Sequence, residues 1–137
     1  MEKKNLDWGN IGFSYVTTDY RYVSNYKDGK WDEGTLTEDP NVVINECAGI
    51  LQYCQECFEG LKAYTTEDGS IVTFRPDLNA ERMMDSCARL EMPQFPKERF
   101  MEALDKVVKA NEAWVPPYGS GATLYIRPYM FASGPVI

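Results

Sequence analysis

Histidine is absent from all 137 residues of this sequence. It is the side chain that most often serves as a general base near neutral pH, and it is also a common metal ligand. Its absence excludes serine–histidine and cysteine–histidine nucleophile pairs, and every metal site that contains histidine. Any catalysis therefore has to use lysine, tyrosine, a carboxylate, cysteine or a cofactor.

Positive charge is also scarce, because 14 Lys and Arg residues face 21 Asp and Glu residues and leave a formal net charge of −7. A partner such as nucleic acid or an anionic membrane surface requires a basic face, so the composition argues against both. Hydrophobic residues make up 44% of the chain and aromatic residues 13%. A chain of this length and composition can bury a core and indicates a folded domain.

Long hydrophobic runs are missing as well. No run approaches the ~18 apolar residues that a membrane-spanning helix needs. The first residues, MEKKNLDW, contain no apolar stretch of the kind found in signal peptides. We therefore expect a cytoplasmic protein.

Cysteine occurs four times, at Cys47, Cys54, Cys57 and Cys87. The spacing of Cys54 and Cys57 is found in redox pairs and in one half of a zinc site. A zinc ribbon needs a second such pair, and a thioredoxin-like motif needs a strand–helix–strand setting, which this region does not show. We expect reduced, metal-free thiols that are partly buried.

The clearest local pattern lies between Cys57 and Arg82. Two β-rich runs, at 61–65 and 71–75, flank Asp68-Gly69, and this dipeptide between two such runs is typical of a β-hairpin. Pro76 ends the second strand. Asp77 or Asn79 can then cap a helix that we expect from about 79 to 90.

Arg82 falls in the first turns of that expected helix. A helix N-terminus attracts anions, so an arginine at this place can help to hold a phosphate group. The alternative is an ordinary surface arginine, which the spacing alone favours.

The remaining sequence predicts a mixture of strands and helices. We expect strands at 11–22, 42–44 and 123–131, a turn at Asp28-Gly29, and helices within 48–57 and from about 96 to 113. The buried stripes of the two longer helices are expected to contain Met83, Cys87, Leu90, Phe100, Leu104, Val107 and Val108. The pairs Glu102–Lys106 and Asp105–Lys109 have i,i+4 spacing on the solvent side, where each contributes only ~0.2–0.5 kcal/mol.

One face of the strand expected at 123–131 carries Thr123, Tyr125 and Arg127, because side chains alternate along a strand. A phenol and a guanidinium two residues apart on a buried strand are unusual. The strand either lies at the edge of a sheet, which Pro128 supports, or forms the wall of a pocket.

Three blocks together resemble the branched-chain amino acid aminotransferases, which are pyridoxal 5'-phosphate enzymes of fold type IV. They are FEGLKAY at 58–64, FRPDLNAERM at 74–83 and LYIRP at 124–128, and their order and separations fit the family. The resemblance extends from about Gly12 onward. It implies an α+β domain with a mostly antiparallel sheet and two main helices.

The family's Schiff-base lysine lies downstream of anything present in this sequence. The resemblance therefore implies that residues 1–137 form the N-terminal domain of a two-domain, homodimeric enzyme, and that the chain alone is inactive and exposes an apolar surface where the second domain packs. Lys62 is not expected to replace the missing lysine, because relatives often carry lysine or arginine there without using it for the Schiff base.

The resemblance also implies an activity and a set of site residues. The activity is amino-group transfer between leucine, isoleucine or valine and 2-oxoglutarate, with pyridoxal phosphate as the cofactor. Arg82 is expected to bind the cofactor phosphate, and no catalytic residue or metal ligand is expected within this chain. The expected substrate-binding residues are Phe13, Tyr53, Phe58, Tyr125 and Arg127, with Tyr53 able to reach the neighbouring subunit's site and Arg127 meeting the side-chain carboxylate of glutamate.

Two alternatives remain open. Another fold type IV enzyme, such as a D-amino acid transaminase or an aminodeoxychorismate lyase, would share this scaffold. A non-catalytic binding or assembly domain would keep the scaffold and lack the chemistry. The sequence Tyr125-Ile126-Arg127 and the long N-terminal extension favour the branched-chain type.

Overall fold

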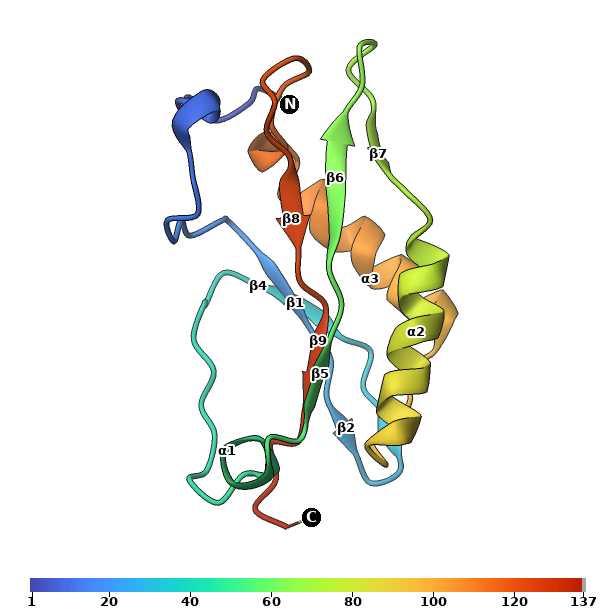
Figure 1. Cartoon of the computed structure of the whole chain (residues 1–137). Coiled ribbons are helices and arrows are strands. Elements are labelled where there is room, and N and C mark those ends of the chain that lie inside the picture. Colours follow the sequence, from blue (N-terminus) through green and yellow to red (C-terminus); the bar gives the residue numbers. More distant parts are fainter. Residues whose placement is uncertain (137) are drawn as a thin grey trace.

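The computed structural model describes residues 1–136 and has the expected α+β class, with small antiparallel sheets and two main helices (Figure 1). In the central strands, β5 (Glu56–Phe58) pairs with β9 (Tyr129–Phe131), and β6 (Leu61–Thr65) lies between β7 (Ile71–Thr73) and β8 (Leu124–Ile126). The main helices, α2 (Pro76–Arg89) and α3 (Lys97–Ala110), pack against each other beside and behind these strands.

The other elements are short. They are the 3₁₀ helices η1 (Trp8–Asn10) and η2 (Glu112–Trp114), the helix α1 (Gly49–Tyr53), the strand pair β1 (Arg21–Val23) and β4 (Thr35–Thr37), and the hairpin β2 (Tyr26–Lys27) and β3 (Lys30–Trp31). The turn predicted at Asp28-Gly29 connects β2 to β3 and is confirmed. Within residues 1–136, none of the helices combines the length and the apolar character needed to cross a bilayer.

The predicted central hairpin is confirmed. Strands β6 and β7 are antiparallel, with Tyr64 opposite Val72. The turn contains Gly69 at a φ of 87°, a left-handed conformation that glycine adopts without strain. The Asp68 carboxylate accepts hydrogen bonds from the Thr66 hydroxyl and from the backbone N–H of Ser70, and these bonds lower the pKa of Asp68 to about 2.

Helix α2 begins three residues earlier than the sequence predicted, and the prediction of an Asp77 or Asn79 cap was wrong. Pro76 occupies the first turn, where its missing N–H needs no partner, and the preceding Arg75 has a φ of 45° without a side-chain cap. The Asp77 carboxylate binds the Arg75 guanidinium instead, at 2.7 and 2.9 Å. Asn79 is buried and is bound to Glu59.

The main core lies where β5 meets α2 and the start of α3. Its buried members are Cys57, Ala80, Met83, Cys87, Met92 and Phe100. Met83 and Cys87 were predicted to be buried, whereas Leu90 is 38% exposed because it follows the last residue of α2. The Sγ atoms of Cys57 and Cys87 are 3.5 Å apart, and burial raises the pKa of the Cys87 thiol to about 12.

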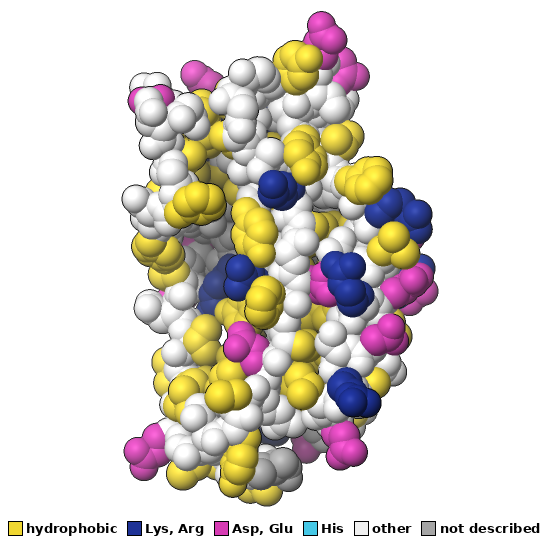
Figure 2. Space-filling model, viewed as in Figure 1, with side chains coloured by type: hydrophobic (Ala, Val, Ile, Leu, Met, Phe, Trp, Pro, Cys, Tyr) yellow, Lys and Arg dark blue, Asp and Glu magenta, His cyan; other side chains and the backbone are white. Residues whose placement is uncertain are grey.

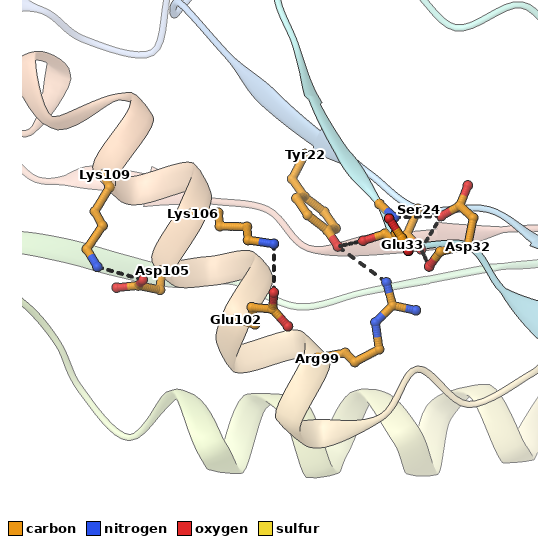
Figure 3. Close-up of polar contacts among 10 residues, drawn as sticks. Tyr22, Ser24, Asp32, Glu33, Arg99, Glu102, Asp105, Lys106 and Lys109 are labelled. Atoms are coloured by element: carbon orange, nitrogen blue, oxygen red, sulfur yellow. Dashed lines mark hydrogen bonds and ion pairs between the residues drawn. The ribbon is translucent and has the colours of Figure 1, made fainter.

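Helix α3 buries Phe100 and Leu104, while Val107 and Val108 are only half-buried. Both predicted ion pairs are present on its solvent side, Glu102–Lys106 at 2.6 Å and Asp105–Lys109 at 2.8 Å (Figure 3). At the start of the helix, Arg99 donates a hydrogen bond of 3.5 Å to the Tyr22 hydroxyl, which ties α3 to β1.

Two strand predictions were wrong in extent. Of residues 11–22 only Arg21 and Tyr22 enter a strand, because the partner strand β4 is short; β propensity without a partner ladder does not make a strand. Residues 42–44 form no strand, and Val43 is 97% exposed.

Two further boundaries differ from prediction because the backbone changes direction. The helix expected within 48–57 ends at Tyr53, since Cys54 adopts a left-handed φ of 52°, and residues 56–58 form β5 instead. The single strand expected at 123–131 is divided at Arg127-Pro128 into β8 and β9, which pair with different strands. The edge position considered for this strand applies to β8 in the sheet β7-β6-β8.

The assigned core predicts that two phenylalanines differ clearly in their contribution to stability. We expect Phe100→Ala to lower the free energy of unfolding by about 3–5 kcal/mol, because Phe100 is 5% exposed and its removal leaves a cavity. Phe74→Ala is the matched control, since Phe74 is 81% exposed and should change stability by less than about 0.5 kcal/mol. Urea unfolding of the two variants measures the difference, and equal losses would contradict the assigned core.

Candidate functional site

Three of the predicted site residues meet in one cluster on the open face of the central strands. The guanidinium carbon of Arg127 lies 4.3 Å from the ring centroid of Phe58 and 5.2 Å from that of Tyr125, both within cation–π range. The Arg127 Nε donates a hydrogen bond of 3.2 Å to the Tyr125 hydroxyl. We call Phe58, Tyr125 and Arg127 the aromatic–arginine cluster.

The cluster forms because two antiparallel ladders follow one another along the same pair of chain segments. Segment 56–58 pairs with 129–131, and segment 61–63 pairs with 124–126. Between the ladders, the Glu59 N–H donates a 2.8 Å hydrogen bond to the Pro128 carbonyl. Phe58 at the end of β5 is thereby held beside Tyr125 and Arg127 on the opposite segment.

Gly60 makes room for the Tyr125 ring. A Cβ atom at position 60 would lie 2.4 Å from the Tyr125 hydroxyl oxygen, a distance that real contacts do not reach. The Tyr125 phenol can therefore keep its place, and its bond to Arg127, only while position 60 is glycine.

Side-chain alternation separates two faces of the segment that carries β5 and β6. Cys57, Glu59, Leu61 and Ala63 are buried, whereas Phe58, Lys62 and Tyr64 are exposed on the other face. Figure 2 shows hydrophobic side chains gathered along the centre of the molecule, over these strands, with Lys and Arg side chains among them.

Glu59 is the charged residue among these four buried side chains and is 6% exposed. Both oxygens of its carboxylate accept hydrogen bonds. Arg82 donates to it from Nε at 2.8 Å and from Nη2 at 2.6 Å, and Asn79 donates from Nδ2 at 2.9 Å. Burial on its own would raise the pKa of Glu59, but the hydrogen bonds from Arg82 and Asn79 and the positive charge of Arg82 outweigh it and lower the pKa.

Arg82 itself lies in the second turn of α2 with its side chain 64% exposed. It borders a shallow hollow between β5 and α2 whose lining residues are Cys57, Arg82, Asp85, Ser86, Arg89 and Leu90. Because Glu59 uses Nε–H and one Nη2–H, three of the five guanidinium N–H groups have no partner within residues 1–136. These groups are available to an anion, so this arginine is suited to bind a phosphate.

Phe13 and Tyr53 are not part of the aromatic–arginine cluster. Phe13 lies in the irregular segment between η1 and β1 with a fully exposed ring, and Tyr53 ends α1 with 65% of its surface exposed. Their assignment to a substrate pocket stays a prediction.

The role of Glu59 and Asn79 was not found by sequence reasoning, although one signal was present. Between Cys57 and Tyr64, buried and exposed side chains alternate, and Glu59 is at a buried position. The other buried positions of this run hold apolar residues. A buried carboxylate requires a cation and hydrogen-bond donors, and the following helix offers an asparagine and an arginine three residues apart.

No protein-family model matches the chain. Similar curated proteins are the branched-chain-amino-acid aminotransferases of Haemophilus influenzae, 57% identical over 131 residues, and of Helicobacter pylori, 47% identical over 131 residues. A methionine aminotransferase of Arabidopsis thaliana is 45% identical over 134 residues. These matches cover 96–97% of the chain, but the chain spans only 38% of the length of each relative.

Solved structures with the same fold include a branched-chain aminotransferase from Thermoproteus uzoniensis with norvaline, with a TM-score of 0.61 and 26% identity. It aligns with 75% of this chain and 32% of its own length. The T.th. branched-chain amino acid aminotransferase, complexed with N-(5'-phosphopyridoxyl)-L-glutamate, has a TM-score of 0.64 at 23% identity. It aligns with 85% of this chain and 34% of its own length.

The lowered pKa of Glu59 makes stability depend on pH in a defined direction. Its ionised form stabilises the fold fully above the ordinary glutamate pKa of about 4.3, and this contribution is lost as the pH falls through the lower folded pKa. Glu59→Gln cannot titrate, so its deficit in unfolding free energy relative to the native chain should shrink below about pH 4.3.

Urea unfolding of both proteins from pH 7 to pH 3 measures this change. Glu102→Gln is the control, because Glu102 is in an exposed ion pair with Lys106 and its removal should cost little at any pH. A Glu59→Gln deficit that stays constant over the whole range would show that the charge of Glu59 does not stabilise the fold.

Proposed function

We propose that this chain, a branched-chain aminotransferase homologue that spans 38% of the length of its relatives, is the N-terminal domain of a two-domain transaminase. In this proposal the full-length enzyme exchanges the amino group of leucine, isoleucine or valine with 2-oxoglutarate. The observation that carries the proposal is the aromatic–arginine cluster, in which a guanidinium is held against two aromatic rings.

The cluster suits a pocket that must accept two unlike side chains. The rings of Phe58 and Tyr125 are 56% and 49% exposed, and they offer apolar surface to the side chain of leucine. A glutamate side chain needs a cation at the same place, because burying an unpaired carboxylate is prohibitive. Arg127 uses Nε for the bond to Tyr125, which leaves its two Nη groups for that carboxylate.

The cofactor proposed for the full-length enzyme is pyridoxal phosphate, which when bound supplies the electron sink for amino-group transfer. Arg82 fits its phosphate, because the guanidinium is exposed and keeps N–H donors that Glu59 does not use. Lys62 is exposed on the face of β6 that carries Tyr64, and we give it no role as the lysine that binds the cofactor. In this proposal that lysine lies in a second domain, outside residues 1–137.

A homodimer remains part of the proposal, with Phe13 and Tyr53 as further substrate-pocket residues. Both rings are exposed on segments outside the central strands, so they are free to contribute to a pocket completed by another domain or subunit. A cytoplasmic location also remains a prediction.

Methionine transamination is the second candidate activity. The Arabidopsis thaliana methionine aminotransferase is 45% identical to this chain, close to the 47% of the Helicobacter pylori relative. A thioether side chain would contact the same aromatic rings as leucine does. Comparison of leucine and methionine as amino donors for the full-length enzyme separates the two activities.

Arg127 provides the test of the proposed substrate range. In the full-length enzyme, Arg127→Ala should reduce kcat/KM for the glutamate half-reaction more than tenfold beyond its effect on leucine. The reason is that removing one partner of a desolvated charge pair costs about 3–5 kcal/mol. Single-turnover absorbance of the cofactor measures each half-reaction.

Arg99→Ala is the matched control, because the Arg99 guanidinium also lies over an aromatic ring, 5.0 Å from that of Phe95, but outside the cluster. It should affect both half-reactions equally and slightly. If Arg127→Ala lowers both half-reactions by the same factor, Arg127 does not recognise the glutamate side chain and the assigned role is wrong.

A further inference from the structure

Arg82 presents two different edges. The edge formed by Nε and Nη2 is bound to Glu59 at 2.8 and 2.6 Å, which is the side-on geometry of a bidentate pair. The other edge, formed by Nη1 and the second Nη2–H, has no partner within residues 1–136. The side chain is 64% exposed although the carboxylate that holds it is 6% exposed.

The carboxylate of Glu59 is fixed more firmly than an ion pair on the surface. Asn79 donates to it at 2.9 Å and also to the Gly60 carbonyl at 3.3 Å, and Asn79 is itself 8% exposed. The backbone of Glu59 is anchored by the 2.8 Å bond from its N–H to Pro128. Strand, helix and carboxylate therefore form one unit that limits the rotamers of Arg82.

An unrestrained arginine loses considerable rotamer freedom when it binds a ligand. If its position is fixed beforehand, part of that entropy is already lost on folding and the affinity for the ligand increases. The negative charge of Glu59 acts in the opposite direction, because it partly cancels the attraction of Arg82 for an anion. The sign of the effect of Glu59 on anion binding shows which of the two dominates.

We propose that Glu59 is a positioning residue, whose buried carboxylate holds Arg82 with its free edge presented to the phosphate of the cofactor. The inference rests on the proposed function, because it requires Arg82 to contact that phosphate. It assigns Glu59 no contact with cofactor or substrate, and its effect passes through Arg82 alone.

The test measures cofactor affinity in the full-length apoenzyme by titration with pyridoxal phosphate and with pyridoxal, which lacks the phosphate group, followed by quenching of protein fluorescence. The variants are Glu59→Gln, Arg82→Ala and the double variant. Asp77→Asn is the matched control, since it removes the exposed side-on pair that Asp77, in the first turn of the same helix, forms with the preceding Arg75.

Glu59→Gln should raise the Kd for pyridoxal phosphate about tenfold, within the range of couplings between contacting residues. The Kd for pyridoxal should not change, and the double variant should bind pyridoxal phosphate no more weakly than Arg82→Ala. Asp77→Asn should bind both ligands as the native enzyme does. A general disturbance of structure would instead weaken both ligands together.

The proposal is overturned if Glu59→Gln leaves the Kd for pyridoxal phosphate unchanged or lowers it, if both ligands weaken equally, or if the loss persists without Arg82. Should Glu59→Gln not fold, Asn79→Ala removes one of the three hydrogen bonds to the carboxylate, and the same outcomes apply with an expected rise of about threefold. If Arg82→Ala itself leaves the Kd unchanged, the cofactor contact of the proposed function fails as well. A weakened Arg82→Ala beside an unaffected Glu59→Gln overturns the positioning role alone.

Discussion

The pairing of segment 56–63 with segment 124–131 is the interaction on which the rest of the structure depends. It consists of two short antiparallel ladders joined by the hydrogen bond from Glu59 to Pro128. Neither ladder is longer than three residue pairs, but together they place Phe58 beside Arg127 and aim Glu59 at α2. The loss of this pairing would separate the aromatic–arginine cluster and leave Arg82 without its carboxylate.

The two arginines of the candidate site are held by different physical means. Arg127 lies against the rings of Phe58 and Tyr125, an environment that tolerates a cation but leaves its Nη groups unpaired within residues 1–136. Arg82 is tied to a buried carboxylate that it partly neutralises. The chain thus offers one arginine against apolar surface, which in the proposed enzyme would suit a carboxylate that only some substrates carry. The other arginine has a fixed orientation, suited to an anion of constant position.

The sequence predicted the elements whose signals are local. The Asp68-Gly69 hairpin, the stripe of Met83 and Cys87, and the ion pairs of α3 depend on residues within a few positions of one another, and all are present. The predictions failed where a distant partner decides the outcome. Residues 11–20 have a β-forming composition but no partner strand to pair with. The end of α1 at Tyr53 follows from the left-handed turn at Cys54.

In the candidate site, too, local features were predicted and contacts between distant residues were not. Alternation alone placed Tyr125 and Arg127 on one face, and the structure agrees, because both side chains meet there. The bond between Glu59 and Arg82 joins residues 23 positions apart, and no local pattern encodes such a distance. Only the position of Glu59 in the alternating run between Cys57 and Tyr64, among side chains that are buried, indicated that it needed a partner. The identity of that partner depended on how α2 packs.

The sulfur atoms at the centre of the core have a consequence for how the domain can be observed. Cys57 and Cys87 join β5 to α2, with the Met130 sulfur of β9 3.5 Å from Cys87, whereas Cys47 and Cys54 are exposed. Burial raises the pKa of both core thiols, that of Cys87 to about 12, so we expect both to react with a thiol reagent more slowly than the two exposed thiols. The reaction of Cys87, which is 0% exposed, with a thiol reagent should therefore report opening of the contact between β5 and α2, whereas Cys47 and Cys54 can react in the folded domain.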